Sequence, residues 1–251
     1  QYFTSLNPAE LRQINPYALT LYFYYMIEQQ GIGLFNESGK RLPYNTLCFS
    51  IMSDLWKSIQ GDGKKQDLFQ AIRNFKYNGE SYLNFFHKFN IDNILFTFNL
   101  GKTYEGLKSK FVGYVPFPES KIKIIPYDVV DYKISVTADS VSYYILYPPD
   151  SKPNFDKRIS LSAKGLNNNF QKISAIEIID KDKKNLSYNI QDLPITDGTC
   201  TYTLYTQNGY IEKKMSVFNP TKIIFVVTNA SKINMTIKVD QHFSLQRPAF
   251  M

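Results

Sequence analysis

Apolar side chains recur at helical spacing over the first hundred residues, between well-marked helix boundaries. Asn15 and Pro16 form an N-cap followed by a first-turn proline, and an apolar run over residues 17–27 continues until Gly31. Apolar residues surround this segment on almost every side. Because a helix that is apolar all round must be covered on most sides, we expect a core helix here rather than an amphipathic membrane helix.

Three further helices are expected before residue 100. Residues 47–60 and 66–77 carry apolar side chains every three to four positions, and Gly61 and Gly79 mark their ends. Ser81 then caps a fourth apolar, aromatic-rich segment. The pattern predicts an N-terminal α-helical segment of about four helices at residues 1–100.

Beyond Gly101 the helical period gives way to short strand-like stretches between turn residues. Prolines at positions 116, 118 and 126 exclude a continued helix. Nine strands are expected, at residues 130–136, 142–147, 158–163, 173–179, 186–190, 199–205, 214–218, 222–228 and 233–239. Short strands at near-regular spacing are typical of a sandwich or barrel rather than a parallel sheet. We therefore predict an α+β protein whose helical segment is followed by an antiparallel β-sandwich at residues 101–251.

Two of these strands and one turn have distinctive patterns. In the last strand, Ile233, Met235, Ile237 and Val239 alternate with polar residues, so one face should meet solvent. The preceding stretch, residues 223–227, has no alternation, which is typical of an interior strand covered on both faces. Asn208 and Gly209 are a strong hairpin signal because both residues tolerate positive φ.

The charge pattern argues against two classes of partner. The formal net charge is +7, but lysines are interspersed with acidic residues along the predicted strands and turns. Nucleic-acid binding would need a basic stripe or patch, so we expect a solvated surface and no nucleic-acid partner. No run of eighteen apolar residues exists, so no membrane span is expected. The chain starts at Gln1 without a visible leader peptide, which indicates a trimmed, processed or partial chain.

Residues able to carry chemistry are few and separated. The two histidines are His87 and His242, and the chain has no His-Glu-x-x-His and no Cys-x-x-Cys. Gly-x-Ser-x-Gly and phosphate-binding glycine loops are absent as well. Cys48 and Cys200 are expected to be buried free thiols, with a disulfide between the two halves as the alternative in an oxidising compartment. We therefore expect no catalytic, cofactor-binding or metal-binding residue in this chain.

Acidic residues and glycosylation motifs have simpler interpretations. Asp180 and Asp182 alternate with lysine but lack the glycine and distal glutamate of a calcium loop, which favours a charged hairpin turn. Asp128 and Asp131 flank a strand start and are expected to be surface or capping groups. Asn-x-Ser/Thr motifs indicate glycosylation only in a secretory eukaryote, and they occur at Asn36, Asn185, Asn229 and Asn234.

The order of the helical segments suggests a family. Apolar and aromatic patterns follow one another at residues 17–31, 51–56, 67–72 and 82–90, and a Val-Val-x-Asn strand end lies at residues 226–229. This arrangement resembles the C-terminal part of secreted bacterial zinc metallopeptidases of the gluzincin type. In that family the zinc-binding His-Glu-x-x-His helix and the later glutamate ligand precede the segment that resembles residues 17–31, so this chain lacks them.

The resemblance implies a non-catalytic C-terminal region that supports a zinc peptidase domain and binds substrate or a cell surface. It implies a secreted or cell-surface location and a protein or peptide partner, with zinc held only by the missing upstream region. No family catalytic residue maps onto this sequence. The alternatives are a separate β-sandwich binding or adhesion module for a glycan or protein, which an exposed aromatic row would favour, and a structural subunit of a surface assembly.

Overall fold

The computed structural model describes residues 25–26, 53–54, 57, 72–74, 79–95, 123–148, 156–182, 185–206 and 220–246. The chain divides into two compact units, Gln1–Lys121 and Ile122–Met251. The predicted domains at residues 1–100 and 101–251 stay a prediction.

The N-terminal unit contains one fully described helix, α5 (Tyr82–Leu95). Ser81 caps it, since its hydroxyl accepts a hydrogen bond from the amide of Asn84 at 3.3 Å, as the sequence predicts. The helix buries Phe85 and Phe89, whose rings each lie 5.2 Å from the ring of Tyr25. These contacts join two segments that are far apart in the sequence into one aromatic core.

The expected set of four helices is not supported as a set. The fourth is α5, whereas the other three fall largely outside the described residues. The few described residues within those three are helical, at positions 25–26, 53–54, 57 and 72–74. No helix in the described ranges is long and apolar enough to cross a membrane.

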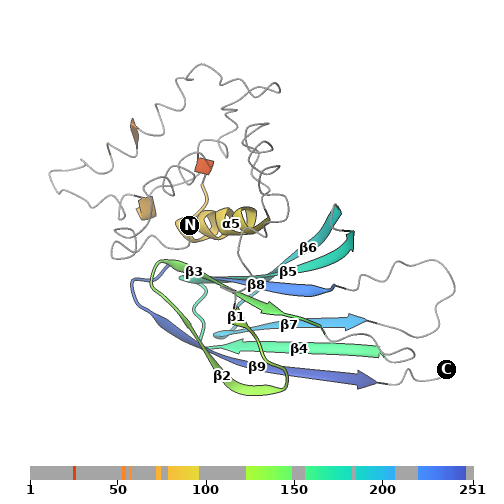
Figure 1. The fold of residues 1–251 in the computed structure, drawn as a ribbon. Coiled ribbons are helices and arrows are strands. Elements are labelled where there is room, and N and C mark those ends of the chain that lie inside the picture. The colour runs from red at the N-terminus through yellow and green to blue at the C-terminus, as the bar shows by residue number, and fades with distance from the viewer. Residues whose placement is uncertain are drawn as a thin grey trace. The chain divides into compact units, whose positions relative to one another are not determined.

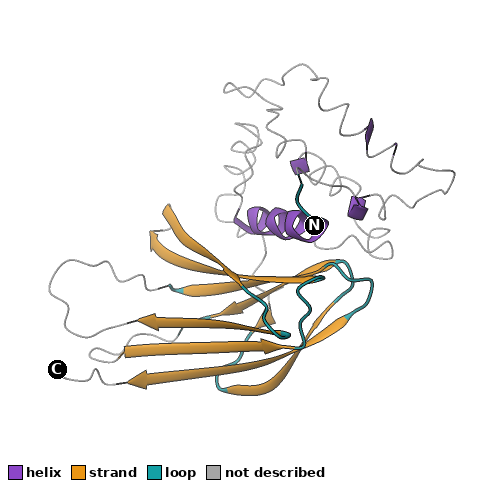
Figure 2. Cartoon of the chain, turned by 180° about the vertical axis from the view of Figure 1, so that it is seen from behind, coloured by secondary structure: helices purple, strands orange, loops and turns teal. Residues whose placement is uncertain are grey.

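The C-terminal unit is a β-sandwich of two sheets, whose strands form two layers in Figures 1 and 2. In spatial order, one sheet contains β1 (Lys123–Ile124), β3 (Ser140–Leu146), β8 (Lys222–Asn229), β5 (Gln171–Asp182) and β6 (Asn185–Leu193). The other contains β2 (Val129–Val136), β9 (Met235–Gln246), β4 (Asp156–Lys164) and β7 (Thr199–Thr206). The β-sandwich part of the predicted fold class is thereby confirmed.

Side chains from both sheets fill the space between the layers. On β9, Ile237 and Val239 are buried while Thr236 and Lys238 are exposed, so the predicted wet face is confirmed. Ile233, expected on the buried side, is 71% exposed. It lies in the loop before β9, where strand alternation no longer applies.

The β8 strand is buried along nearly its whole length, as its unbroken apolar run predicts. Every residue from Ile223 to Asn229 is buried. On β8, Phe225 and Val227 join the core between the sheets, and Ile224 and Val226 alternate with them on the opposite face. The five-stranded sheet is therefore apolar on both faces at its centre.

Eight of the nine expected strands are confirmed, and the ninth, residues 214–218, lies outside the described residues. The antiparallel prediction needs one correction, because β1 pairs with β3 in parallel. Two residues beside Pro126 carry no periodic signal, so β1 could not be expected from the sequence. The last strand also extends further than expected, which places His242 inside β9 rather than after it.

Candidate functional site

The two histidines lie in different units of the chain. His87 is buried in α5, in the N-terminal unit, and His242 is exposed on β9, in the sandwich. Among the described residues, no three His, Cys, Asp or Glu side chains group in a way that could hold a metal ion. The described residues therefore do not supply a ligand set for the zinc ion that the gluzincin resemblance implies.

Cys200 is a free thiol in the core between the sheets, as expected, while Cys48 lies outside the described residues. Only 1% of Cys200 is exposed. Burial raises the pKa of its thiol to about 11, and a backbone hydrogen bond with Ala163 offsets this rise only in part. Because the thiolate is the reactive form, Cys200 is an inert core residue at neutral pH.

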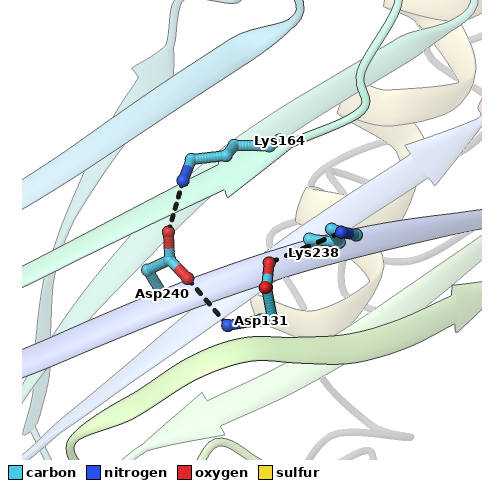
Figure 3. A network of polar contacts seen from close by, with 4 residues as sticks. All are labelled: Asp131, Lys164, Lys238 and Asp240. Carbon is cyan, nitrogen blue, oxygen red and sulfur yellow. Dashed lines mark hydrogen bonds and ion pairs between the residues drawn. The ribbon is translucent and has the colours of Figure 1, made fainter.

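Four charged residues form a network on the solvent face of the four-stranded sheet (Figure 3). Lys164 on β4 binds Asp240 on β9 at 2.6 Å. The other oxygen of Asp240 accepts a hydrogen bond from the backbone amide of Asp131 at 2.8 Å, and Asp131 pairs with Lys238 at 3.6 Å. The hydrogen bond from Lys164 lowers the pKa of Asp240. The network links β4, β9 and β2, so its carboxylates hold strands together.

A β-bulge explains the positions of Asp128 and Asp131. The pairing of β2 with β9 shifts register between Val129 and Tyr132, and both aspartates adopt positive φ, at 49° and 53°. Aspartate tolerates this region better than most residues. The carboxylate of Asp128 accepts the amide of Phe243 at 2.9 Å. Both aspartates are exposed, which confirms that they are surface and capping groups.

A buried amide supports this bulge from inside. The side-chain oxygen of Gln241 on β9 accepts the amide of Asp128 at 2.7 Å, and Gln241 is 0% exposed. Its Nε2 has no hydrogen-bond partner among the described atoms. A buried donor without a partner lowers the stability of the folded state, so the unpaired Nε2 of Gln241 makes this bulge locally destabilising.

Asn229, at the end of β8, is a polar node that joins two loops and the start of β5. Its side-chain nitrogen donates to the carbonyls of Thr137 and Ile233, each at 3.0 Å. Its oxygen accepts from the Ser231 amide at 3.1 Å, the Ser231 hydroxyl at 2.7 Å and Gln171 Nε2 at 3.1 Å. The residue is 0% exposed. The amide therefore stabilises one end of the sandwich.

The two Asn-x-Ser/Thr motifs whose asparagine side chains are described differ in burial. The amide nitrogen of Asn229 is used twice and is inaccessible in the folded chain. Asn234 is exposed, and its oxygen accepts the Ala138 amide at 2.8 Å. The side chains of Asn36 and Asn185 lie outside the described set.

One acidic side chain lies inside the sandwich. Glu177 on β5 is 6% exposed and accepts a hydrogen bond from the phenol of Tyr202 on β7 at 2.7 Å, which connects the two sheets. Its other oxygen accepts from Asn189 Nδ2 on β6 at 3.0 Å. Burial, with Glu177 beside it, raises the pKa of Tyr202 above its ordinary value. The carboxylate therefore acts as an inter-sheet clamp.

Sequence reasoning did not single out Glu177, Gln241 or the structural role of Asn229. A signal existed for Glu177, which interrupts the apolar residues 173–179 at a position that alternation places inside. Gln241 and Asn229 bond to residues that are 113 and 92 positions away along the chain, so no local pattern could reveal them. Asp180 and Asp182 end β5 at the hairpin to β6, as the charged-turn interpretation predicts.

Exposed aromatic side chains do not form a row in the described part of the sandwich. Tyr127 lies before β2, Phe170 before β5 and Tyr188 on β6, with exposed fractions of 40%, 47% and 38%. On β6, Ile190 is 41% exposed and lies on the same face as Tyr188, two positions away. Tyr188 and Ile190 thus lie together on β6, the outermost described strand at one end of the five-stranded sheet.

Comparison with known proteins assigns no family. No protein-family model matches the chain, and no curated protein matches it. Among solved structures, it is similar to the pre-peptidase C-terminal domain of collagenase from Bacillus anthracis, with 13% identity over 48% of this chain and 93% of that one, at a TM-score of 0.29. It is also similar to the Yersinia pseudotuberculosis-derived mitogen, with 11% identity over 48% of this chain and 86% of that one, at a TM-score of 0.27. At these TM-scores neither match assigns an activity or a partner.

Proposed function

We propose that this chain is the non-catalytic C-terminal region of a secreted bacterial protein of the zinc metallopeptidase type. In this proposal the helical segment supports the catalytic domain, and the β-sandwich is an accessory domain that binds a protein substrate or a cell surface. The β-sandwich of the C-terminal unit agrees with the sandwich that the gluzincin resemblance implies.

The observation that carries the proposal is the use of the sandwich's polar side chains. Asp128 and Asp240 each accept a hydrogen bond from a backbone amide, and Glu177 accepts one from Tyr202 and one from Asn189. Asn229 binds two loops and the start of β5. A general base or nucleophile must be able to reach a substrate. Groups that are buried or already bonded between strands favour a scaffold over a reaction centre.

The choice of partner follows from the exposed surface. Carbohydrate recognition by stacking would favour several aromatic rings on one surface, whereas the described exposed rings lie at three separate places. A protein or peptide partner needs only apolar contacts and main-chain pairing. We therefore propose a protein partner in preference to a glycan.

Hydrolysis of a peptide library tests the proposal directly. The purified chain, with and without added zinc, is incubated with a mixture of peptides, and new termini are sought by mass spectrometry. The account expects no new termini in either condition. Zinc-dependent cleavage at defined sites, retained through repeated purification, would refute the non-catalytic assignment.

A glycan array examines the choice of partner. The account expects no glycan to bind above background. Saturable binding of one glycan class that is lost in Tyr188→Ala would instead establish the separate adhesion module.

A further inference from the structure

The β6 strand is the outermost strand at one end of the five-stranded sheet. In the described part of the chain it pairs only with β5, over nine residues from Asn185 to Leu193. Among the described strands, none pairs with the other side of its backbone, whose amide and carbonyl groups form an open row at this end of the sheet. Such a row can template pairing with another strand.

Other outermost strands of the sandwich differ from β6. The β1 strand has two residues and is followed closely by Pro126, which cannot donate to a ladder. The β2 strand carries the bulge and an ion pair between Asp131 and Lys238. The β7 strand exposes Thr201 and Thr203. Bulges, charges and short length are the usual means of preventing edge pairing, and threonine offers little apolar surface.

The middle of β6 has none of these protections. Residues 188–191 carry no charge, proline or glycine, and Tyr188 and Ile190 are exposed on one face. The nearest acidic residue, Asp192, is engaged across the ladder by Ser174 and by Lys172 at 3.1 Å. The strand thus combines free backbone length with apolar side chains at its centre.

The sequence of β6 is suited to pairing with itself. In the antiparallel register that overlaps all nine residues, Asn189 lies on the two-fold axis. Tyr188 then faces Ile190 of a second copy, twice, and an aromatic side chain opposite a β-branched one is a favourable cross-strand pair. Asp192 would face Leu186, so no like charges oppose one another. A two-fold pairing of this kind closes on itself instead of forming a fibre.

We propose that two copies of this chain associate through antiparallel pairing of their β6 strands, which joins their five-stranded sheets into one continuous sheet. Nine paired residues span about 30 Å. A contact of this length without a further apolar face belongs to the small class of interfaces, so we expect a dissociation constant of roughly micromolar order.

Sedimentation analysis over a concentration series tests the proposal with three variants. The wild-type chain should show a monomer–dimer equilibrium. Ile190→Lys and, separately, Tyr188→Lys should each raise the dissociation constant at least about tenfold, because each substitution acts twice across the two-fold axis. Thr203→Lys, an exposed lysine substitution on β7, is the matched control and should leave the constant unchanged.

Hydrogen exchange on the wild-type chain tests the same pairing without relying on the folding of any variant. Raising the protein concentration through the dimerisation range should slow exchange at the backbone amides of β6 and leave those of β7 unchanged. A chain that stays monomeric at the highest concentration, or a dimer that both β6 variants retain, would overturn the proposal. So would a wild-type dimer whose β6 amides exchange at the monomer's rate. Dimerisation and the lack of peptidase activity are measured independently, so either proposal can fail without the other.

Discussion

Replacing Asn229 with alanine removes the polar node at the end of β8. The substitution deletes hydrogen bonds to Thr137, Ile233, Ser231 and Gln171 while leaving the strand pairing intact. The side chain lies at 0% exposure, so water cannot readily replace the lost partners. Gln171, itself 5% exposed, would keep its oxygen bonded to the Asn167 amide but lose the acceptor for its Nε2.

The expected cost follows from the number of bonds and their burial. A hydrogen bond contributes about 0.5–1.5 kcal/mol net, and a buried group left unpaired costs about 1–3 kcal/mol. Because the five short contacts share one side chain, their contributions do not add fully. We therefore expect Asn229→Ala to lower the free energy of unfolding of the sandwich by about 3–5 kcal/mol.

Urea unfolding followed by circular dichroism measures this change in the sheets. Fluorescence of the single tryptophan is unsuitable, because Trp56 belongs to the N-terminal unit. Asn234→Ala is the matched control, since that exposed side chain accepts a single described hydrogen bond, from the Ala138 amide at 2.8 Å. It should cost about 0.5–1 kcal/mol. Equal costs for the two variants, or a cost below about 1 kcal/mol for Asn229→Ala, would refute the reasoning.

Three further predictions concern the core and the charged network. Tyr202→Phe removes one of the hydrogen bonds to the buried carboxylate of Glu177 and should cost about 1.5–3 kcal/mol in the same urea assay; a neutral effect would contradict an inter-sheet clamp. Cys200 should resist alkylation at pH 8 in the folded chain and react in urea, because burial raises the pKa of its thiol to about 11. Peptide mapping identifies the modified residue, and fast labelling of the folded protein would contradict the burial of Cys200. The hydrogen bond from Lys164 lowers the pKa of Asp240, so the stability that this ion pair contributes is complete above about pH 4 and is lost on further acidification. Asp240→Asn should therefore weaken the pH dependence of the free energy of unfolding below that pH. An unchanged pH dependence there would contradict the pairing.

Local patterns predicted the strands well because burial follows position within a strand. The unbroken apolar run of β8 and the alternation in β9 each reflect which faces are covered, and both are visible in a few consecutive residues. Ser81 likewise caps α5 through atoms three positions away. Such features need no knowledge of the rest of the fold.

Features that depend on distant pairing could not be predicted. The bulge at Asp128 and Asp131 depends on how β2 meets β9, more than a hundred positions along the chain. The parallel pairing of β1 with β3 likewise has no periodic signal in two residues. The ion pair between Lys164 and Asp240 depends on the register of β4 against β9, which makes these two residues diagonal neighbours. The position of β6 at the end of the described sheet is a property of the strand order rather than of its own sequence.

The central claim is that the described polar side chains of the sandwich hold its fold together and do not form a metal-dependent reaction centre. Zinc content after exposure to excess zinc and exhaustive desalting tests this claim most directly, by elemental mass spectrometry on the whole chain. The account predicts far less than one zinc ion per chain. One zinc ion retained per chain, and lost on substitution of His87 or His242, would contradict it.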